Sequence, residues 1–213
     1  RSFRVTRGEL VTLIYLSFIS DGSALFLIEG YNYMSSGVAT TLHFMYPVVT
    51  AVVMMTFYHE ARRLSTVLAI VMAVAGVGIL SWDPTGQTSL RGVVIVLISA
   101  VCYALYLIRV NRSRAAHMES LKLVFYIMFI GALIFLAEAL RQNTFQPIAN
   151  ALQLGNLAAL ALICTIVTNV CLVVSVKRIG STMTAVIGAL EPLTAVVIGG
   201  LVFDEAFTWQ VLT

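Results

Sequence analysis

The stretch SGVATTLHFMYPVVTAVVMMTFYHEA, residues 36–61, recurs in outline as STMTAVIGALEPLTAVVIGGLVFDEA at residues 181–206. Aligned without gaps, the two stretches share five identical residues, including a central proline and a glutamate 13 positions after it. These are Pro47 and Glu60 in the first copy and Pro192 and Glu205 in the second. Each copy is long enough to cross a membrane as one helix, because about 20 apolar residues span the hydrocarbon core. The relative orientation of the two copies therefore decides the fold.

The composition is that of a protein with several membrane-spanning helices. Sixty per cent of the 213 residues are hydrophobic and only 11% are charged, whereas soluble domains are about half apolar and about a quarter charged. The alternation that marks the strands of a β-barrel is missing. Seven apolar runs of membrane length follow one another with short links, at residues 10–28, 38–58, 64–82, 92–110, 121–140, 154–176 and 183–203.

The basic residues indicate which ends of these runs face the cytoplasm. Eleven of the 13 Lys and Arg residues lie at run ends or in links that share one side of the membrane, the side on which the chain starts. Only Arg91 and Arg141 lie on the other side. Because cytoplasmic loops carry the excess of Lys and Arg, we expect the first side to be cytoplasmic.

This topology turns the second copy of the repeated helix over. The copy with Pro47 is the second run and the copy with Pro192 is the seventh, so an odd number of crossings separates them. Repeated units in opposite orientations are found in many secondary transporters. We therefore expect an all-α polytopic membrane protein, an inverted repeat of five-helix halves in the inner (plasma) membrane of a bacterium.

The expected halves are unequal in this sequence. Residues 1–82 would belong to the first half, without its first two spans, and residues 83–213 to the second half, whose last span is incomplete. The full protein would then have about ten spans, with both termini in the cytoplasm.

Short motifs accompany the two prolines. Residues 45–50 read MYPVVT, residues 191–194 read EPLT, and a glycine-containing run, 68–80, follows Glu60. With these motifs the whole chain resembles the EamA-type branch of the drug/metabolite transporter superfamily. The resemblance implies a secondary transporter and leaves its substrate open. The family usually has Gly-Glu where this chain has His59-Glu60, which puts the sharp turn at that position in doubt.

Two carboxylates lie near the middle of predicted spans. Asp21 lies in the first run and Glu191 in the seventh, and no Lys or Arg lies mid-span to neutralise them. A charge at the bilayer centre costs about 2.5–3.5 kcal/mol on insertion scales. Each carboxylate is therefore either protonated or placed beside a polar cavity, a cation or His43. The alternative is an internal hydrogen bond that only clamps two helices.

Other polar residues lie at helical spacing on several runs. His43 shares one face of the second run with Thr40 and Thr50. Because lipid cannot satisfy polar groups, such faces should turn inward. They would converge on one cavity in a transporter, although ordinary hydrogen bonding between helices explains them as well. The candidates for substrate binding or ion coupling are Asp21, His43, Tyr46, Tyr103, Asn169 and Glu191.

The features that the two copies of the repeated helix share also have structural interpretations. Pro47 and Pro192 each remove a backbone hydrogen bond, which either serves packing alone or shapes a cavity and acts as a hinge. The resemblance favours the second interpretation. Glu60 and Glu205 lie where apolar runs stop, and we interpret them as caps or ion-pair partners rather than substrate ligands. The three cysteines lie inside spans and suggest neither a metal site nor a disulfide framework.

The leading hypothesis is a secondary active transporter that moves a small metabolite or drug-like solute across the bilayer by alternating access. A seven-helix receptor is one alternative, but it would start outside the cell, against the basic-residue bias. An intramembrane enzyme with Asp21 and Glu191 as a dyad is the other, but no nucleophile motif surrounds them.

Several expectations about partners follow from the transporter hypothesis. The sequence has no Walker A motif, so we expect coupling to a proton or cation gradient rather than ATP hydrolysis by this chain. We expect no catalytic residue, no metal, no cofactor and no nucleic-acid partner. A homodimer is compatible with the sequence.

Overall fold

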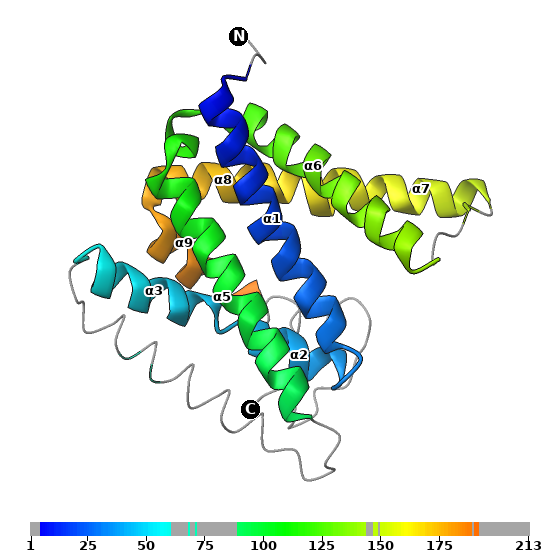
Figure 1. The fold of residues 1–213 in the computed structure, drawn as a ribbon, viewed down its shortest axis with the longest axis horizontal. Coiled ribbons are helices and arrows are strands. Elements are labelled where there is room, and N and C mark those ends of the chain that lie inside the picture. The colour runs from blue at the N-terminus through cyan, green and yellow to red at the C-terminus, as the bar shows by residue number, and fades with distance from the viewer. Residues whose placement is uncertain are drawn as a thin grey trace. The chain divides into compact units, whose positions relative to one another are not determined.

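The structure is a computed structural model that describes residues 5–60, 68, 71, 89–143, 147–148, 150–188 and 190–191. All regular elements in this part of the chain are helices (Figure 1). Five helical stretches are long and apolar enough to cross a membrane: Arg7–Gly30, Ser36–Phe57, Leu90–Arg112, Ser120–Arg141 and Ala151–Ile179. They agree with five predicted runs and confirm an all-α, multi-pass integral membrane protein. Most of the third and seventh runs, with the boundary at residue 82, lie outside the described residues.

The chain divides into two compact units. The first unit is Arg1–Gly22 with Tyr106–Ser181, and the second is Ser23–Leu105 with Thr182–Thr213. Helices α1 (Arg7–Gly30) and α5 (Leu90–Arg112) each begin in one unit and end in the other.

The first unit is built on α1 and α6 (Ser120–Arg141). Leu13 and Leu16 of α1 and Leu123 of α6 are fully buried. Ser17 donates a 2.9 Å hydrogen bond to the carbonyl oxygen one turn earlier in α1, and its Oγ lies 3.5 Å from the Ile127 carbonyl of α6. These contacts place the middle of α1 directly against α6.

Polar side chains join the helix ends of this unit at the side predicted to be cytoplasmic. The Thr6 backbone N–H donates to the Glu9 carboxylate at 2.8 Å, and the Glu9 N–H donates back to the Thr6 hydroxyl at 3.3 Å, which is a capping box at the start of α1. Lys122 of α6 donates to both carboxylate oxygens of Glu9 at 3.2 Å. Asn111 of α5 donates to the Val176 carbonyl at 2.8 Å.

One long helical stretch of the first unit changes its winding midway. It consists of α7 (Ala151–Ala159), the π-helix η2 (Leu160–Val167) and α8 (Thr168–Ile179). In the wide turns, the hydroxyls of Thr165 and Thr168 donate to carbonyl oxygens five residues earlier, at 3.3 Å. A short 3₁₀ helix, η1 (Arg114–His117), links α5 to α6, and α6 packs against α8.

The second unit contains the first copy of the repeated helix, split into α2 (Ser36–His43) and α3 (Tyr46–Phe57). The split falls directly before Pro47, which stands in the first turn of α3. The missing N–H of proline costs no intrahelical bond at that position. The break predicted from Pro47 is therefore present, and it lies between His43 and Tyr46.

The turn after α3 is built on a residue in the left-handed region. His59 has φ +53°, and the backbone N–H groups of Tyr58 and Glu60 both donate to the Met54 carbonyl, at 3.2 and 3.1 Å. Glycine adopts this conformation at no steric cost, and histidine is among the other residues enriched there. The family usually has glycine at the position of His59, and in this chain the turn is formed with histidine instead.

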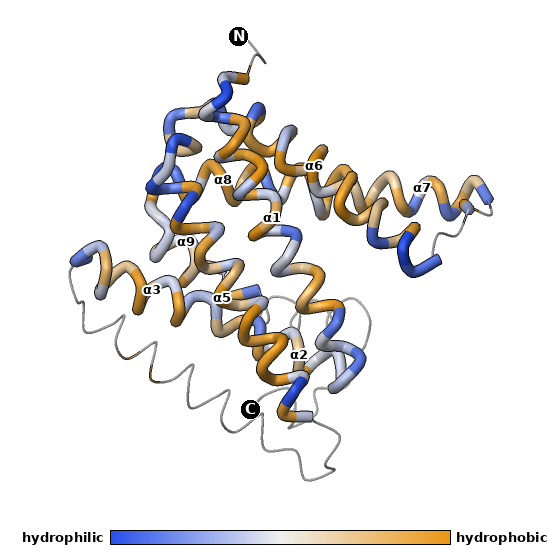
Figure 2. Tube along the Cα trace, viewed as in Figure 1, coloured by the Kyte–Doolittle hydropathy of each residue, from blue (hydrophilic) through white to orange (hydrophobic). Residues whose placement is uncertain are grey.

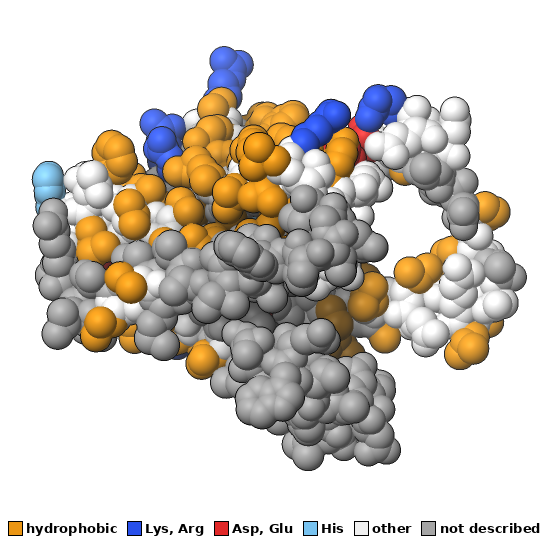
Figure 3. Space-filling model, turned by 90° about the horizontal axis from the view of Figure 1, so that it is seen from below, with side chains coloured by type: hydrophobic (Ala, Val, Ile, Leu, Met, Phe, Trp, Pro, Cys, Tyr) orange, Lys and Arg blue, Asp and Glu red, His pale blue; other side chains and the backbone are white. Residues whose placement is uncertain are grey.

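The described helices consist largely of hydrophobic residues (Figure 2), and hydrophobic side chains lie over much of the described surface on the face that Figure 3 shows. Phe18, Phe57 and Phe129, for example, are more than half exposed. In water, contiguous apolar surface of this kind marks an interaction site. In a bilayer it is the ordinary surface of a helix, because lipid tails are as apolar as leucine.

Candidate functional site

Three polar side chains of the second unit form a hydrogen-bonded chain between α1, α5 and α2. Ser23 Oγ of α1 donates to the Ser99 carbonyl of α5 at 2.8 Å, and Ser99 Oγ donates to the Ser23 carbonyl at 2.6 Å. His43, the last residue of α2, has Nδ1 2.9 Å from Ser99 Oγ. Because the single hydroxyl proton of Ser99 is used in the 2.6 Å bond, we assign His43 Nδ1 as the donor to Ser99 Oγ. In the neutral imidazole, Nε2 is then the acceptor.

Two tyrosine rings lie beside the imidazole. Tyr103 of α5 and Tyr46 of α3 meet edge to face, with ring centroids 4.7 Å apart and an angle of 81° between planes. The His43 ring lies 5.8 Å from the Tyr46 ring and 5.4 Å from the Tyr103 ring. Tyr46 is only 5% exposed, so this group of rings is part of the interior of the unit.

Glu191 places an exposed carboxylate near the same rings, three residues after Gly188. The preceding helix, α9 (Ser181–Gly188), ends against Tyr46. A methyl group added at Gly188 would overlap the Tyr46 hydroxyl oxygen, so the glycine provides the space that this hydroxyl occupies.

We call this group the inner polar cluster. It contains two serines, a histidine, two tyrosines and one carboxylate: Ser23, His43, Tyr46, Ser99, Tyr103 and Glu191. Hydroxyl groups and a neutral imidazole both donate and accept hydrogen bonds, and the carboxylate accepts them or carries a proton. The cluster can therefore hold a small polar or cationic group.

Helices α3 and α9 run in opposite directions beside each other. Thr182, at the start of α9, donates a 2.7 Å hydrogen bond to the carboxylate of Glu60, just after the end of α3. Gly188, at the end of α9, contacts Tyr46 at the start of α3. The described parts of the two repeated helices are therefore antiparallel neighbours. The Glu60 carboxylate also lies at the N-terminus of α9, where the helix dipole favours a negative charge.

Asp21 belongs to the first unit rather than to the inner polar cluster. It lies on α1 one turn after Ser17 and faces α6, where a methyl group added at Gly131 would lie 2.8 Å from each carboxylate oxygen. Its Oδ2 is buried and has no hydrogen-bond partner within the described part of the chain. The contacts described for His43 are with Ser99 and the two tyrosines, so a pairing of His43 with Asp21 remains a prediction.

The other predicted site residues have different positions. Asn169 is in α8 of the first unit, where its side-chain amide donates to the Thr165 carbonyl of its own helix at 2.8 Å. Pro192 and Glu205 lie outside the described residues. Sequence reasoning did not select Ser23 or Ser99 as site residues. The four-residue spacing of Ser99 and Tyr103 on one helix face was the available signal for Ser99, and Ser23 had none.

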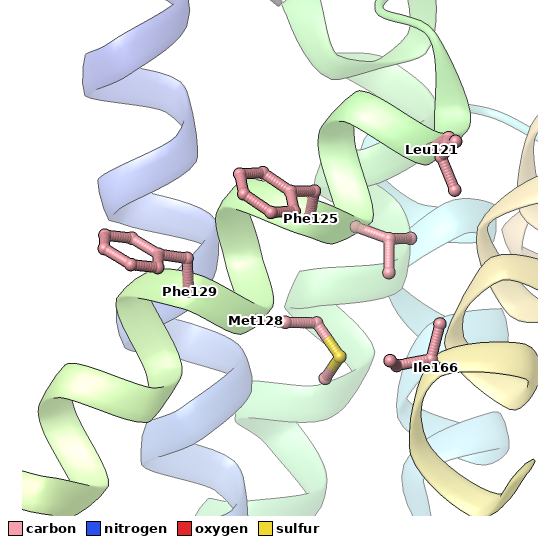
Figure 4. Close-up of a pocket in the computed structure, with 6 residues that line it drawn as sticks. Leu121, Phe125, Met128, Phe129 and Ile166 are labelled. Carbon is pink, nitrogen blue, oxygen red and sulfur yellow. The ribbon is translucent and has the colours of Figure 1, made fainter. Parts of the chain in front are cut away.

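An apolar pocket of about 380 Å³ opens on the first unit (Figure 4). It lies between α6 and η2 and is lined by Leu121, Val124, Phe125, Met128, Phe129 and Ile166. Ligand sites for polar solutes need a few placed polar groups to fix orientation. This lining offers only apolar side chains, so we interpret the pocket as part of the lipid-facing surface.

Comparison with known proteins agrees with these features. The model of the EamA-like transporter family matches residues 1–82 and 90–213. The chain is also 26% identical over 185 residues to a protein of Synechocystis sp. named "Uncharacterized transporter sll1319", an alignment that covers 83% of this chain and 54% of that protein. The chain thus spans about half the length of this curated relative. Because the family match covers nearly all of the sequence, the chain belongs to the EamA-like transporter family.

Proposed function

We propose that the protein is a secondary active transporter that moves a small metabolite or drug-like solute by alternating access, and that the solute binds at the inner polar cluster. The family and the name of the relative indicate a transporter rather than an enzyme. The observation that carries the proposed site is the contact of Gly188, three residues before Glu191, with the Tyr46 hydroxyl, which joins the two copies of the repeated helix beside His43 and Tyr103.

The broken helix supports this location. Transporter sites commonly lie where discontinuous helices meet near the membrane midplane, because the broken ends expose partial charges and hydrogen-bonding groups. Here His43 ends α2 and Tyr46 begins α3, so two ring residues of the cluster flank the break before Pro47. Pro47 would then shape the cavity and act as a hinge, as proposed from the sequence.

The antiparallel contact between α3 and α9 supports the inverted repeat. Two homologous helices of opposite orientation must run in opposite directions, and the Thr182–Glu60 and Gly188–Tyr46 contacts give this direction. The two ranges that match the family are separated at residues 83–89, beside the proposed division into 1–82 and 83–213. We propose that the beginnings of α1 and α6 and the ends of α5 and α8 face the cytoplasm of a bacterial inner membrane.

The enzyme alternative, with Asp21 and Glu191 as a dyad, has less support, because the family and the named relative are transporters.

Transport by the reconstituted protein tests the proposal. The full-length protein in proteoliposomes would be offered a panel of radiolabelled amino acids and small metabolites, with and without a pH gradient. We expect at least one solute to accumulate when a gradient is imposed and to exchange with unlabelled solute when it is not. Accumulation and exchange no greater than in protein-free vesicles, across the panel, would contradict the transporter proposal for these solutes.

A pair of glycine variants tests the site. Gly188→Ala places a methyl group where the Tyr46 hydroxyl lies, while Gly155→Ala places one in open space. Both changes replace glycine by alanine in a helix, which by itself favours the helix by about 1 kcal/mol. We expect Gly188→Ala to reduce exchange of the solute and Gly155→Ala to leave it unchanged. Equal exchange in the two variants would show that the inner polar cluster is not part of the binding site.

A further inference from the structure

We propose that Asp21 and Gly131 form a proton-binding site between α1 and α6, and that this site couples transport to the proton gradient. The coupling role rests on the proposed transporter function, whereas the protonation of Asp21 does not. The proposal uses none of the residues of the inner polar cluster, so it assigns solute binding and proton binding to different side chains.

The first observation is a buried carboxylate oxygen that lacks a hydrogen-bond partner among the described residues. Oδ2 of Asp21 is buried and has no hydrogen-bond partner in the described part of the molecule. Asp21 is also 14 residues into α1, about 21 Å along the helix axis from its start, and thus well within the hydrocarbon region of a span. An ionised carboxylate without a partner is strongly disfavoured in such surroundings. Binding a proton neutralises it and supplies an O–H donor.

The second observation is the glycine that faces the carboxylate. A methyl group at position 131 would lie 2.8 Å from Oδ1, 2.8 Å from Oδ2 and 3.0 Å from Cγ of Asp21. Real side-chain carbons do not approach oxygen so closely, so only glycine leaves this carboxyl in place. Gly131 is itself buried, one turn after the buried Ile127 on the same face of α6. The two helices therefore bury one oxygen of the acid and leave room for a neutral carboxyl group, while Asp21 as a whole is partly buried.

The surroundings favour a proton over a metal cation. Ca²⁺ and Mg²⁺ require at least six oxygen ligands, from the protein or from water. The nearest polar side chain one turn earlier on α1 is Ser17, whose hydroxyl already donates to the Leu13 carbonyl at 2.9 Å. The carboxyl of Asp21 is the acid that this part of α1 presents to α6, and a single acid needs only one proton to become neutral.

The other charged groups on α1 and α6 lie near the helix ends, and Glu29, at the end of α1, accepts a hydrogen bond from the Asn32 side chain. Glu9 is 12 residues before Asp21, about 18 Å along α1, and binds Lys122 of α6. Glu138 is about 10 Å along α6 beyond Gly131 and pairs with Arg141. The titratable tyrosines of the two helices contact other groups: the Tyr15 ring lies beneath the Arg109 guanidinium, and Tyr126 packs edge to face on Phe125.

The charged residues of α5 and α8 in this unit lie in the last turns of the two helices. They are Arg109 and Arg112 in the last turn of α5, and Lys177 and Arg178 in the last turn of α8. Lys177 donates to the Met118 carbonyl. Each of these basic residues is close to a helix end that we place at the cytoplasmic surface. Along these helices, therefore, none of them lies at the middle of the span, where Asp21 is.

The proposed step is a simple protonation. The carboxylate of Asp21 takes one proton from the aqueous side to which the site is open and becomes a neutral carboxyl, and it returns that proton on the other side. No other bond changes. Only the neutral form would allow α1 and α6 to close over the acid, because closing removes the water that would otherwise solvate the charge.

Infrared spectroscopy of the full-length protein tests the protonation directly. The carbonyl stretch of a protonated carboxyl group is separate from the bands of ionised carboxylates and backbone amides. We expect a protonated-carboxyl band at neutral pH that loses intensity in Asp21→Asn and is unchanged in Glu138→Gln. We also expect the remaining band to shift in Gly131→Ala, which crowds the acid without removing it. A band unaltered in Asp21→Asn would overturn the proposal.

Transport by the same variants tests the coupling. Asparagine has the size of the protonated acid but carries no exchangeable acid proton. We therefore expect Asp21→Asn to keep exchange of labelled for unlabelled solute and to lose pH-driven accumulation, down to the level of protein-free vesicles. Full pH-driven accumulation in Asp21→Asn would refute the coupling role. If the wild-type protein transports no solute, the transporter proposal fails while the infrared result still decides whether Asp21 is protonated.

Discussion

The hydroxyl of Thr182 donates a 2.7 Å hydrogen bond to the carboxylate of Glu60, so the second copy of the repeated helix begins where the first copy ends. The contact explains why a glutamate stands after the apolar run of the first copy, since it accepts a hydrogen bond at the N-terminus of the partner helix. It also gives the two copies opposite directions, which an inverted repeat requires.

This contact predicts a stability difference between two Thr182 variants. Thr182→Val removes the donor but keeps the shape, and we expect it to lower stability by about 1 kcal/mol, the usual net contribution of a hydrogen bond. Thr182→Ser keeps the donor and should melt close to the wild type. Thermal unfolding of the detergent-purified protein measures both. Equal melting of the valine and serine variants would mean that the bond contributes nothing.

The turn at His59 predicts an unusual ranking of substitutions. His59 adopts φ +53°, a conformation that costs non-glycine residues about 1–2 kcal/mol. His59→Gly should therefore be neutral or stabilising, although glycine usually destabilises, and the β-branched His59→Val should lower the melting temperature. A glycine variant that melts well below the valine variant would show that the left-handed turn is not formed.

The hydrogen bond between Ser99 and His43 predicts that a change at Ser99 weakens solute binding even though Glu191 keeps its carboxylate. Ser99→Ala removes the acceptor of the His43 Nδ1–H and frees the ring to change tautomer and orientation. We expect solute affinity to fall by about threefold to tenfold, as for the loss of one hydrogen bond. Ser99→Thr keeps the hydroxyl and should retain most of the affinity. The measurement is the concentration dependence of exchange, and unchanged affinity in Ser99→Ala would exclude the imidazole from the site.

The topology predicts which side of the membrane each loop faces. Single cysteines at Thr85 and Arg114, in a background without Cys102, Cys164 and Cys171, would be treated with an impermeant thiol reagent in whole cells. We expect labelling at position 85 but not at position 114, because the basic residues cluster on the side of Arg114. Labelling at position 114 alone would reverse the topology.

The sequence predicts much of the fold because apolar runs are long and proline acts locally. The five described spans begin and end within three residues of the predicted runs, and the helix breaks next to Pro47 because its ring and missing N–H are local constraints. The widening of the helix at Leu160–Val167 was not predicted, because this largely apolar run gives no local signal for extra residues in a turn.

The division of the site was harder to predict. Asp21 and Ser23 are two residues apart on α1, yet Asp21 faces α6 and Ser23 bonds to α5. A helix that is apolar all round lacks the periodic pattern that would assign its faces to particular neighbours. The association of Asp21 with Glu191 therefore stays a prediction, and so does a shared site of His43 and Glu191.

Uptake by Glu191→Gln tests the central claim, that the carboxylate beside Tyr46 and Tyr103 binds the solute. The proteoliposome assay would measure both gradient-driven accumulation and exchange across a range of pH. Glutamine keeps the size of the side chain and removes its charge, so we predict loss of both activities, in contrast to Asp21→Asn. Glu138→Gln, which changes a partly exposed acid paired with Arg141, should be nearly silent. Wild-type accumulation and exchange by Glu191→Gln at every pH would contradict the account.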